Sequence, residues 1–354
     1  MLVYIGVYFL LSWAALTVKE QSQRFWLIFF SIFLLWFMGA RNEVGCDWSG
    51  YYHRFLITPL YQSLGDLFSD FDEPGFWLLT KFVRENDLSY MWLNMFATII
   101  IVSCLLRFCR AHRDGLLILA LLFPVVIVQL SMSGIRQGLA VGFITVASVS
   151  WMRGSKLWTA IWILVAAQFH TSALMFLPIA PLAGRKVTGI ALFGSALILG
   201  PVAVMLLGDR FETYSDRYLE SDDITSGGAL IRYVLVLMPA LFFLKYREKL
   251  GNSFSDSFQL MRLTTALTFS LIPVAFFSSI LLHRVIYYVM PLSIVTFAAL
   301  GRVAFPRLNR GIVLFLPVLL YGSYTTIWFL TSRHADICYL PYKNFWGLSS
   351  MLGL

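Results

Sequence analysis

Long apolar runs, separated by short polar segments, recur along the whole chain of 354 residues. About 20 consecutive apolar residues cross the hydrocarbon core of a bilayer as one helix, so the sequence predicts roughly twelve spans. We place them at residues 1–17, 25–40, 89–107, 114–131, 137–151, 157–169, 171–183, 188–207, 230–245, 262–282, 285–300 and 311–331. Hydrophobic residues make up 59% of the chain and charged residues 13%, which is not the composition of a soluble domain. We therefore expect an all-α, polytopic integral membrane protein that forms a single domain over residues 1–354 and has the lipid bilayer as a partner.

Two of these spans need a choice of interpretation. The runs 157–169 and 171–183 meet at Gln168–Thr171 with almost no loop, so they form either a tight helical hairpin or one long broken helix. The hairpin preserves the alternation of loops across the membrane, and we adopt it.

The N-terminal run needs a separate interpretation. Residues 1–16 resemble the apolar part of a signal peptide but lack a basic start and an Ala-x-Ala cleavage site, so we expect a retained first span.

Orientation follows from the lysine and arginine residues in the loops, which are enriched on the cytoplasmic side. If the segment after the first span is cytoplasmic, the cytoplasmic loops hold 16 of the 27 basic residues. The acidic residues in those loops are only Glu20, Asp114, Glu248 and Asp256. Both termini are then expected outside the cytoplasm. The net charge of +8 does not indicate a nucleic-acid partner, because the basic residues form no continuous stripe.

Two outer segments are long enough to cover a site, residues 41–88 and 208–229. The first is expected to contain short helices at Tyr61–Phe68 and Pro74–Arg84. The second is acidic and is either a lid or a plain solvated loop.

Five polar clusters fall on the outer side in this topology, and we take their convergence as the main sign of a site. Charges at the end of a membrane span are expensive unless they face water, a partner or a ligand. The clusters are the segment Met38–Tyr52 with Arg41, Glu43 and Asp47; the segment Ser133–Gln137; Phe169–Thr171; His283–Arg284; and Tyr339–Tyr342.

Arg136 and Gln137 lie at the expected start of a span, after Ser133 and Gly134. A guanidinium group matches a phosphate in a two-pronged fork, and a helix start attracts anions. Alternatively, Arg136 reaches lipid phosphates at the membrane surface. Because Gln137 and small residues accompany it, we favour contact with a ligand. Arg41 and Arg284 are further phosphate-binding candidates, His283 stands beside Arg284, and several arginines at one mouth suit a diphosphate.

Proton transfer has three candidates. His170 is either a buried, hydrogen-bonded core residue or a group that moves a proton to or from a sugar hydroxyl. Asp47 or Glu43 is either a general base or the partner of Arg41 in a salt bridge.

Three tyrosines also lie in these clusters. Tyr51, Tyr339 and Tyr342 either stack on sugar rings or belong to the aromatic belt at the membrane surface.

The four cysteines are in no Cys-x-x-Cys motif and show no metal-ligand spacing, so we expect neither a metal nor a cofactor. Cys104 and Cys109 are expected to be inert core residues. Cys46 and Cys338 both fall outside, where they either pair in an oxidising compartment or remain free.

The ordered set of motifs resembles the EpsG family of bacterial polysaccharide polymerases, which is similar in role to the Wzy O-antigen polymerases. The motifs are Gly39-Ala40-Arg41, Val44-Gly45-Cys46-Asp47 and Tyr51; Ser133 to Ala140; Phe169 to Leu174; and Tyr339-Leu340-Pro341-Tyr342. Cys46 stands where the family is expected to have a small polar residue such as threonine. The resemblance covers most of the chain.

The resemblance implies a GT-C-like glycosyltransferase of the bacterial inner membrane that works at the periplasmic face. No DxD-type metal site stands at a helix mouth, so we expect a metal-independent reaction. Its donor and acceptor would be oligosaccharides linked to undecaprenyl diphosphate, with a chain-length regulator as a further partner. Asp47, His170 and Arg136 are then the catalytic candidates. Substrate-binding candidates are Arg41, Arg136, Gln137, Arg284, His283, Tyr51 and Tyr339.

Two other functions fit less well. A transporter or flippase of lipid-linked glycans would place polar groups near the middle of the membrane and often shows internal repeats, which we do not find. A membrane acyltransferase would favour a deep histidine with an acid nearby, and His170 alone does not meet that pattern.

Overall fold

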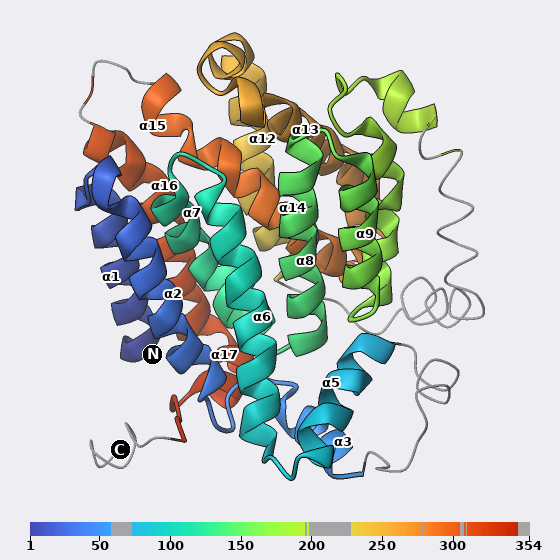
Figure 1. Ribbon diagram of the computed structural model, residues 1–354. Helices are drawn as coiled ribbons and strands as arrows, with labels where there is room; N and C mark the ends of the chain where they lie inside the picture. Colours follow the sequence, from blue (N-terminus) through green and yellow to red (C-terminus); the bar gives the residue numbers. More distant parts are fainter. Residues whose placement is uncertain are drawn as a thin grey trace. The chain divides into compact units, whose positions relative to one another are not determined.

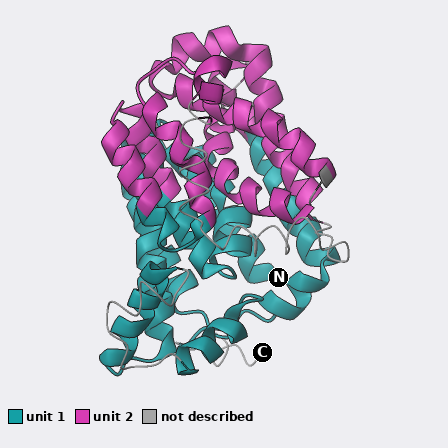
Figure 2. Ribbon diagram, turned by 90° about the vertical axis from the view of Figure 1, so that its right-hand side faces the viewer, with its two compact units in different colours: residues 1–143, 165–171, 315–354 teal, residues 144–164, 172–314 magenta. Residues whose placement is uncertain are grey.

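The computed structural model describes residues 1–57, 73–194, 197, 228–277, 279–304, 308 and 310–345. In these ranges the regular structure is helical, which confirms the all-α part of the predicted fold class, whereas the GT-C-like architecture stays a prediction (Figure 1). The chain forms two compact units, coloured separately in Figure 2. The first contains residues 1–143, 165–171 and 315–354, and the second contains residues 144–164 and 172–314.

Seven helices of the described ranges are long and apolar enough to cross a membrane. They are Glu20–Gly39, Tyr90–Arg110, Ile135–Met152, Ala229–Ser253, Ser255–Phe276, Ser279–Val303 and Gly311–Thr331. Four shorter apolar helices, Leu2–Thr17, Gly115–Ser131, Lys156–Ala167 and Thr171–Leu182, match other runs that the sequence predicted as spans. The predicted span at 188–207 and the segments Tyr61–Phe68 and 208–227 lie largely or wholly outside the described residues. The chain is thus a multi-pass membrane protein, while the number twelve stays a prediction.

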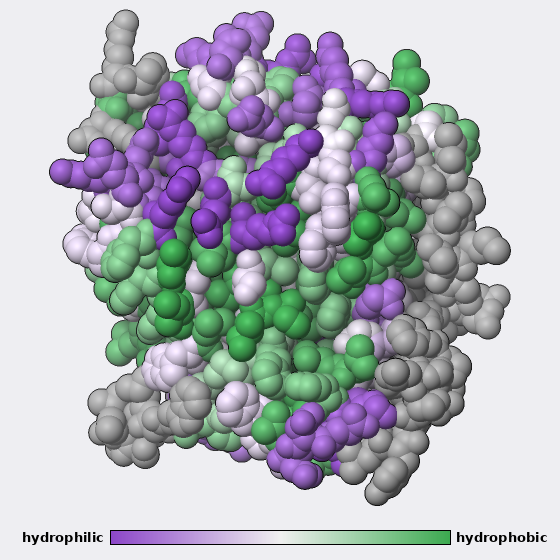
Figure 3. Space-filling model, viewed as in Figure 1, coloured by the Kyte–Doolittle hydropathy of each residue, from purple (hydrophilic) through white to green (hydrophobic). Residues whose placement is uncertain are grey.

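The helices of the first unit pack as an apolar bundle. Helix α2 (Gln23–Gly39) lies against α6 (Tyr90–Arg110), and α1 (Leu2–Thr17) lies against α7 (Gly115–Leu122). Large side chains on the outer flanks remain exposed, among them Phe9 at 65% and Phe25 at 66%. Figure 3 shows hydrophobic side chains along such flanks. Exposed flanks of this kind suit contact with lipid tails.

Tyrosine hydroxyl groups connect the two ends of the chain inside this unit. Tyr4 donates to the backbone oxygen of Tyr339 at 3.0 Å, and Tyr8 donates to that of Val318 at 2.6 Å. Tyr339 in turn donates to the backbone oxygen of Gln129 at 3.0 Å. Buried bonds of this kind stabilise a fold by about 1 kcal/mol each, and here they fix the C-terminal segment against α1.

A π-helix, η2 (Phe123–Ser131), continues α7. Pro124 lies at its start and has no backbone N–H to donate, so the regular α-helical ladder cannot continue through it. Short π-helical segments often mark functional sites. This one ends at Ser131, two residues before Ser133 and four before the start of α8 (Ile135–Met152).

In the second unit, α12 (Ala229–Ser253), α13 (Ser255–Phe277) and α14 (Ser279–Ala298) pack against one another. Helix α9 (Lys156–Ala167) and the 3₁₀-helix η3 (Thr171–Leu182) follow each other in the chain. Gly154, before α9, lies so close to Gly184, after η3, that a Cβ built on Gly184 would be 2.9 Å from the Gly154 Cα. The chain therefore returns on itself, which confirms the helical hairpin.

The expected break at His283–Arg284 is wrong. Helix α14 begins at Ser279, so both residues lie in its first two turns rather than between spans. A charged pair ends an apolar run in the sequence, but lysine, arginine and histidine are all compatible with a continuing helix. Helix α13 ends at Phe277 and α14 begins at Ser279, before the charged pair.

The segment after α2 is attached to the C-terminal segment by covalent and hydrogen bonds. Cys46 and Cys338 form a disulfide with their Cα atoms 4.7 Å apart, so of the two alternatives the structure shows the paired one. Arg41 forms an antiparallel bridge with Asn344, and the Gly45 N–H donates to the Cys338 oxygen at 2.7 Å. Cys104 and Cys109 are buried, as expected.

The disulfide predicts a redox-dependent mobility. Non-reduced protein should migrate faster on a denaturing gel than reduced protein, because the bond closes a loop with a sequence separation of 292 residues. Cys338→Ser should abolish the difference, whereas Cys104→Ser, a buried free cysteine, should leave it unchanged. Equal mobility of the reduced and non-reduced wild-type protein would contradict the pairing.

Candidate functional site

Gly45 brings the segment after α2 into contact with the end of the π-helix. Its φ of +110° is in the left-handed region that favours glycine. A Cβ at this position would be 2.0 Å from the Met132 backbone oxygen. The close approach that glycine permits places the next acidic residue, Asp47, beside Ser133.

Asp47 is exposed and lies against the loop between η2 and α8. The Ser133 hydroxyl donates to Asp47 Oδ2 at 3.5 Å and accepts from the Asp47 backbone N–H at 3.4 Å. The carboxylate of Asp47 is therefore held by the protein and open to solvent, where it can accept a proton from a ligand.

Tyr51 lies one turn after Asp47, in α3 (Trp48–Ile57), and faces Arg136. The Arg136 Nε donates to the Tyr51 hydroxyl at 3.4 Å, and the Arg136 Cζ lies 5.6 Å from the centre of the Tyr51 ring. Burial raises the pKa of Tyr51, so its hydroxyl stays neutral near pH 7. One turn of α3 thus brings Asp47 and Tyr51 to the start of α8.

Arg136 stands in the first turn of α8, as predicted, and pairs with Glu73. The Arg136 Nη1 lies 2.5 Å from Glu73 Oε2, with side-chain exposures of 28% and 5%. Removing one partner of a buried ion pair typically costs about 3–5 kcal/mol, because the other charge is left uncompensated. The sequence did not single out Glu73, which precedes α5 (Pro74–Glu85). The one available signal was Pro74, since proline after an acidic residue often begins a helix.

The turn that carries His170 is attached to the start of α5. Gly75, which lies two residues after Glu73, donates its backbone N–H to the Gln168 backbone oxygen at 2.9 Å. Phe169 stacks on Phe143 of α8 with ring centres 5.4 Å apart. His170 and Gln137 are both buried. His170 therefore lies on a turn fixed to the same two helices that carry Glu73 and Arg136.

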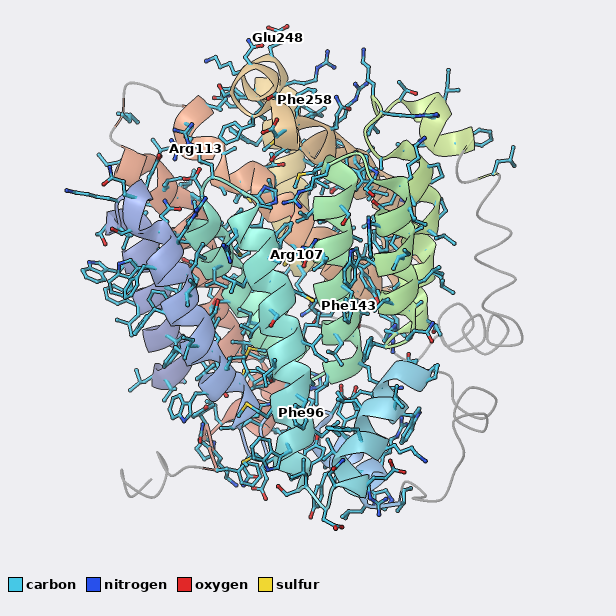
Figure 4. All side chains as sticks on the ribbon, viewed as in Figure 1. Phe96, Arg107, Arg113, Phe143, Glu248 and Phe258 are labelled. Carbon is cyan, nitrogen blue, oxygen red and sulfur yellow. A yellow bond between two sulfur atoms is a disulfide. The ribbon has the colours of Figure 1, made fainter. Side chains whose placement is uncertain are left out.

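Figure 1 shows α3 and α5 at one end of α6. Figure 4 shows Phe96 nearer to this end of α6 and Arg107 toward the opposite end. The last turn of α6 contains Arg107 and Arg110. The candidate site and this basic turn are thus at opposite ends of one membrane-spanning helix.

Arg41 differs from Arg136 because it is enclosed by aromatic residues. It is 1% exposed, and its Nη1 donates to the Met38 backbone oxygen at 2.5 Å. Burial lowers its pKa, opposed by the nearby hydroxyls of Tyr4, Tyr90, Tyr339 and Tyr342. The salt bridge to Glu43 that the sequence left open is not formed among the described residues, because Glu43 pairs with Lys343 at 2.5 Å. Binding of diphosphate by Arg41 stays a prediction.

Two tyrosines of the C-terminal motif are engaged within the protein. Tyr339 is 3% exposed and packs edge-on against Trp328. Tyr342 donates to the Phe37 backbone oxygen at 2.8 Å, and burial raises its pKa to about 12. Their contact with a sugar stays a prediction.

His283 and Arg284 belong to the second unit. There the Arg232 Nη2 lies 2.9 Å from His283 Nδ1, and the Arg232 Cζ lies 5.7 Å from the centre of the Tyr287 ring. Arginine only donates, so Nδ1 of His283 accepts and its proton is on Nε2. The sequence did not single out Arg232, and the membership of these residues in one site with Arg136 stays a prediction.

One group of potential metal ligands occurs in the described part of the chain: Cys46, His334 and Cys338. Their ligand atoms lie within 4.8 Å of one another. The disulfide engages both sulfur atoms, so only the His334 imidazole can donate to a metal while the bond is intact. Sequence spacing did not indicate this group, because its members are brought together by the fold.

The comparisons with known proteins agree with the motifs. A family model described as the EpsG family matches residues 24–344. No curated protein and no solved structure matches the chain.

Gly45→Ala should destabilise the protein by at least about 2 kcal/mol, because the added Cβ meets a backbone oxygen in a φ region that alanine avoids. The measurement is the thermal unfolding midpoint in detergent. Gly50→Ala is the matched control, since a Cβ there has nothing within 4 Å. If the two variants unfold at the same temperature, the close approach at Gly45 is not essential.

Proposed function

The chain belongs to the EpsG family, and on this premise we propose that it is a membrane polysaccharide polymerase that elongates a lipid-linked glycan. The donor is a glycan on undecaprenyl diphosphate, and the acceptor is a sugar hydroxyl of a second lipid-linked repeat unit. The observation that carries the proposal is the group formed by Arg136, Tyr51 and Asp47 at the start of α8. In this group Arg136 and Tyr51 are in contact although they are 85 residues apart in sequence. The polymerase activity follows from the family, and the group supplies a cation and a carboxylate for it.

In the proposed reaction, the acceptor hydroxyl attacks the anomeric carbon of the donor. The new glycosidic C–O bond forms while the bond from the anomeric carbon to the diphosphate oxygen breaks, and its electron pair stays on the diphosphate. Arg136 stabilises the negative charge that develops there. The proton of the acceptor hydroxyl passes to a base, for which Asp47 is the exposed candidate and His170 the buried one.

Two observations support an extracytoplasmic location for this chemistry. The Cys46–Cys338 disulfide adjoins Asp47, and disulfides persist in oxidising compartments. Arg107 and Arg110 occupy the opposite end of α6, as expected for a cytoplasmic end. We propose that the protein resides in the bacterial inner membrane with this site on the periplasmic side.

The test is to incubate membranes with lipid-linked repeat units and to follow the ladder of longer glycans. Arg136→Ala should reduce the rate of ladder formation by roughly 100-fold or more, because the leaving group loses a fixed positive charge. Arg113→Ala is the control, since among the described residues it breaks only an exposed 3.7 Å pair with Glu20. A normal ladder from folded Arg136→Ala would remove Arg136 from the mechanism, and transport of repeat units without any ladder from the wild type would favour a flippase.

We also propose that the reaction needs no metal ion. Ladder formation should then continue unchanged in excess chelator, because arginine neutralises the diphosphate. Loss of activity in chelator followed by recovery on addition of Mg²⁺ alone would contradict this.

A further inference from the structure

Glu73 is the described carboxylate that contacts the proposed diphosphate ligand Arg136, across 63 positions of sequence. We propose that Glu73 is a positioning residue that fixes the Arg136 guanidinium in the orientation needed to receive a diphosphate. The inference rests on the proposed function, because it assigns a role toward the same site.

Two of the nitrogen atoms of Arg136 are held by protein. Glu73 engages Nη1 and the Tyr51 hydroxyl engages Nε, while the Tyr51 ring lies beside the guanidinium. Two contacts on different edges fix both the position and the plane of the group. No hydrogen bond among the described residues uses Nη2, and the proposal assigns this nitrogen to the ligand.

Glu73 is itself held in place. It lies directly before Pro74, at the start of α5, and the Phe76 N–H donates to its backbone oxygen at 3.1 Å. Its carboxylate is 5% exposed, whereas the Arg136 side chain is 28% exposed. In the pair, Arg136 is thus the open member and Glu73 the enclosed one. A fixed guanidinium needs no reorganisation as charge develops on the leaving group, which is how preorganised charge lowers a barrier.

The role of the oxygen atom can be separated from the role of the charge. Glutamine at position 73 keeps an oxygen acceptor for Nη1 but removes the negative charge, whereas alanine removes both. Charge-assisted hydrogen bonds are about twice as strong as neutral ones, so Glu73→Gln should hold Arg136 less firmly and Glu73→Ala not at all. A negative charge beside Arg136 also opposes an incoming anion, so the glutamine variant should bind diphosphate at least as tightly as the wild type.

The experiment measures ladder formation per folded enzyme. We expect kcat to fall by roughly 10-fold in Glu73→Gln, with KM equal or lower, and by roughly 100-fold in Glu73→Ala. In an Arg136→Ala background, Glu73→Gln should cause no further loss, since Glu73 acts through Arg136. Glu85→Gln at the end of α5 is the control, because in the described part of the chain it breaks only the partly exposed pair with Lys81. Its activity should equal that of the wild type.

Three results would overturn the inference. Equal losses in the glutamine and alanine variants would make Glu73 a general base. Unchanged kcat per folded enzyme in both would make it a purely structural residue. A further loss in the Arg136→Ala background would show that it acts independently of Arg136. Where Glu73→Ala does not fold, Glu73→Gln alone and Glu73→Gln combined with Arg136→Ala decide between these results.

A binding measurement separates this inference from the proposed function. Inorganic diphosphate should raise the thermal unfolding midpoint of the wild type and of Glu73→Gln, but not that of Arg136→Ala. If the wild type forms no ladder but shows this pattern, the polymerase proposal fails while the assignment of Arg136 as a diphosphate ligand stands. If the wild type forms a ladder and the Glu73 variants match it, the positioning role fails alone.

Discussion

The ion pair between Arg136 and Glu73 organises the end of the first unit that contains the candidate site. A positive charge at the start of a membrane-spanning helix is costly unless it is compensated, and Glu73 compensates it at 2.5 Å. Three segments depend on this pair. Helix α3 places Tyr51 on the guanidinium, Pro74 begins α5 directly after Glu73, and Gly75 attaches the turn that carries His170. Because each segment is attached separately, the pair fixes the relative position of groups that are far apart in sequence.

The two arginines of this unit have different surroundings, and their chemistry should differ accordingly. Arg41 is enclosed by tyrosine side chains and is bridged to the C-terminal segment, and its Nε has no hydrogen-bond partner among the described residues. Its backbone bridge to Asn344 connects the segment after α2 to the C-terminal segment. Arg136 is partly exposed and compensated by a carboxylate. A ligand can therefore reach Arg136 without unpacking the bundle, which is why the proposed chemistry is built on Arg136.

Local sequence patterns predicted a large part of this arrangement. Residues 89–107 correspond closely to α6 (Tyr90–Arg110), α8 begins beside Arg136 as expected, and the hairpin at His170 is confirmed. These features follow from apolar run length and from residues near in sequence. Glu73 was missed because it stands in a sequence with Asp70 and Asp72 that resembles a solvated acidic turn. Its partner is 63 residues away, and a single sequence carries no record of such a contact. The break placed at His283–Arg284 failed for a related reason, since charge ends an apolar run without ending a helix.

The most direct test of the central claim is the structure of the protein in a lipid nanodisc with a non-transferable sugar diphosphate of undecaprenol. A density map should place the diphosphate within hydrogen-bonding distance of Arg136 Nη2, with Glu73 still on Nη1 and Asp47 facing the sugar. Diphosphate density bound elsewhere, with Arg136 and Glu73 unchanged and remote from it, would contradict the claim.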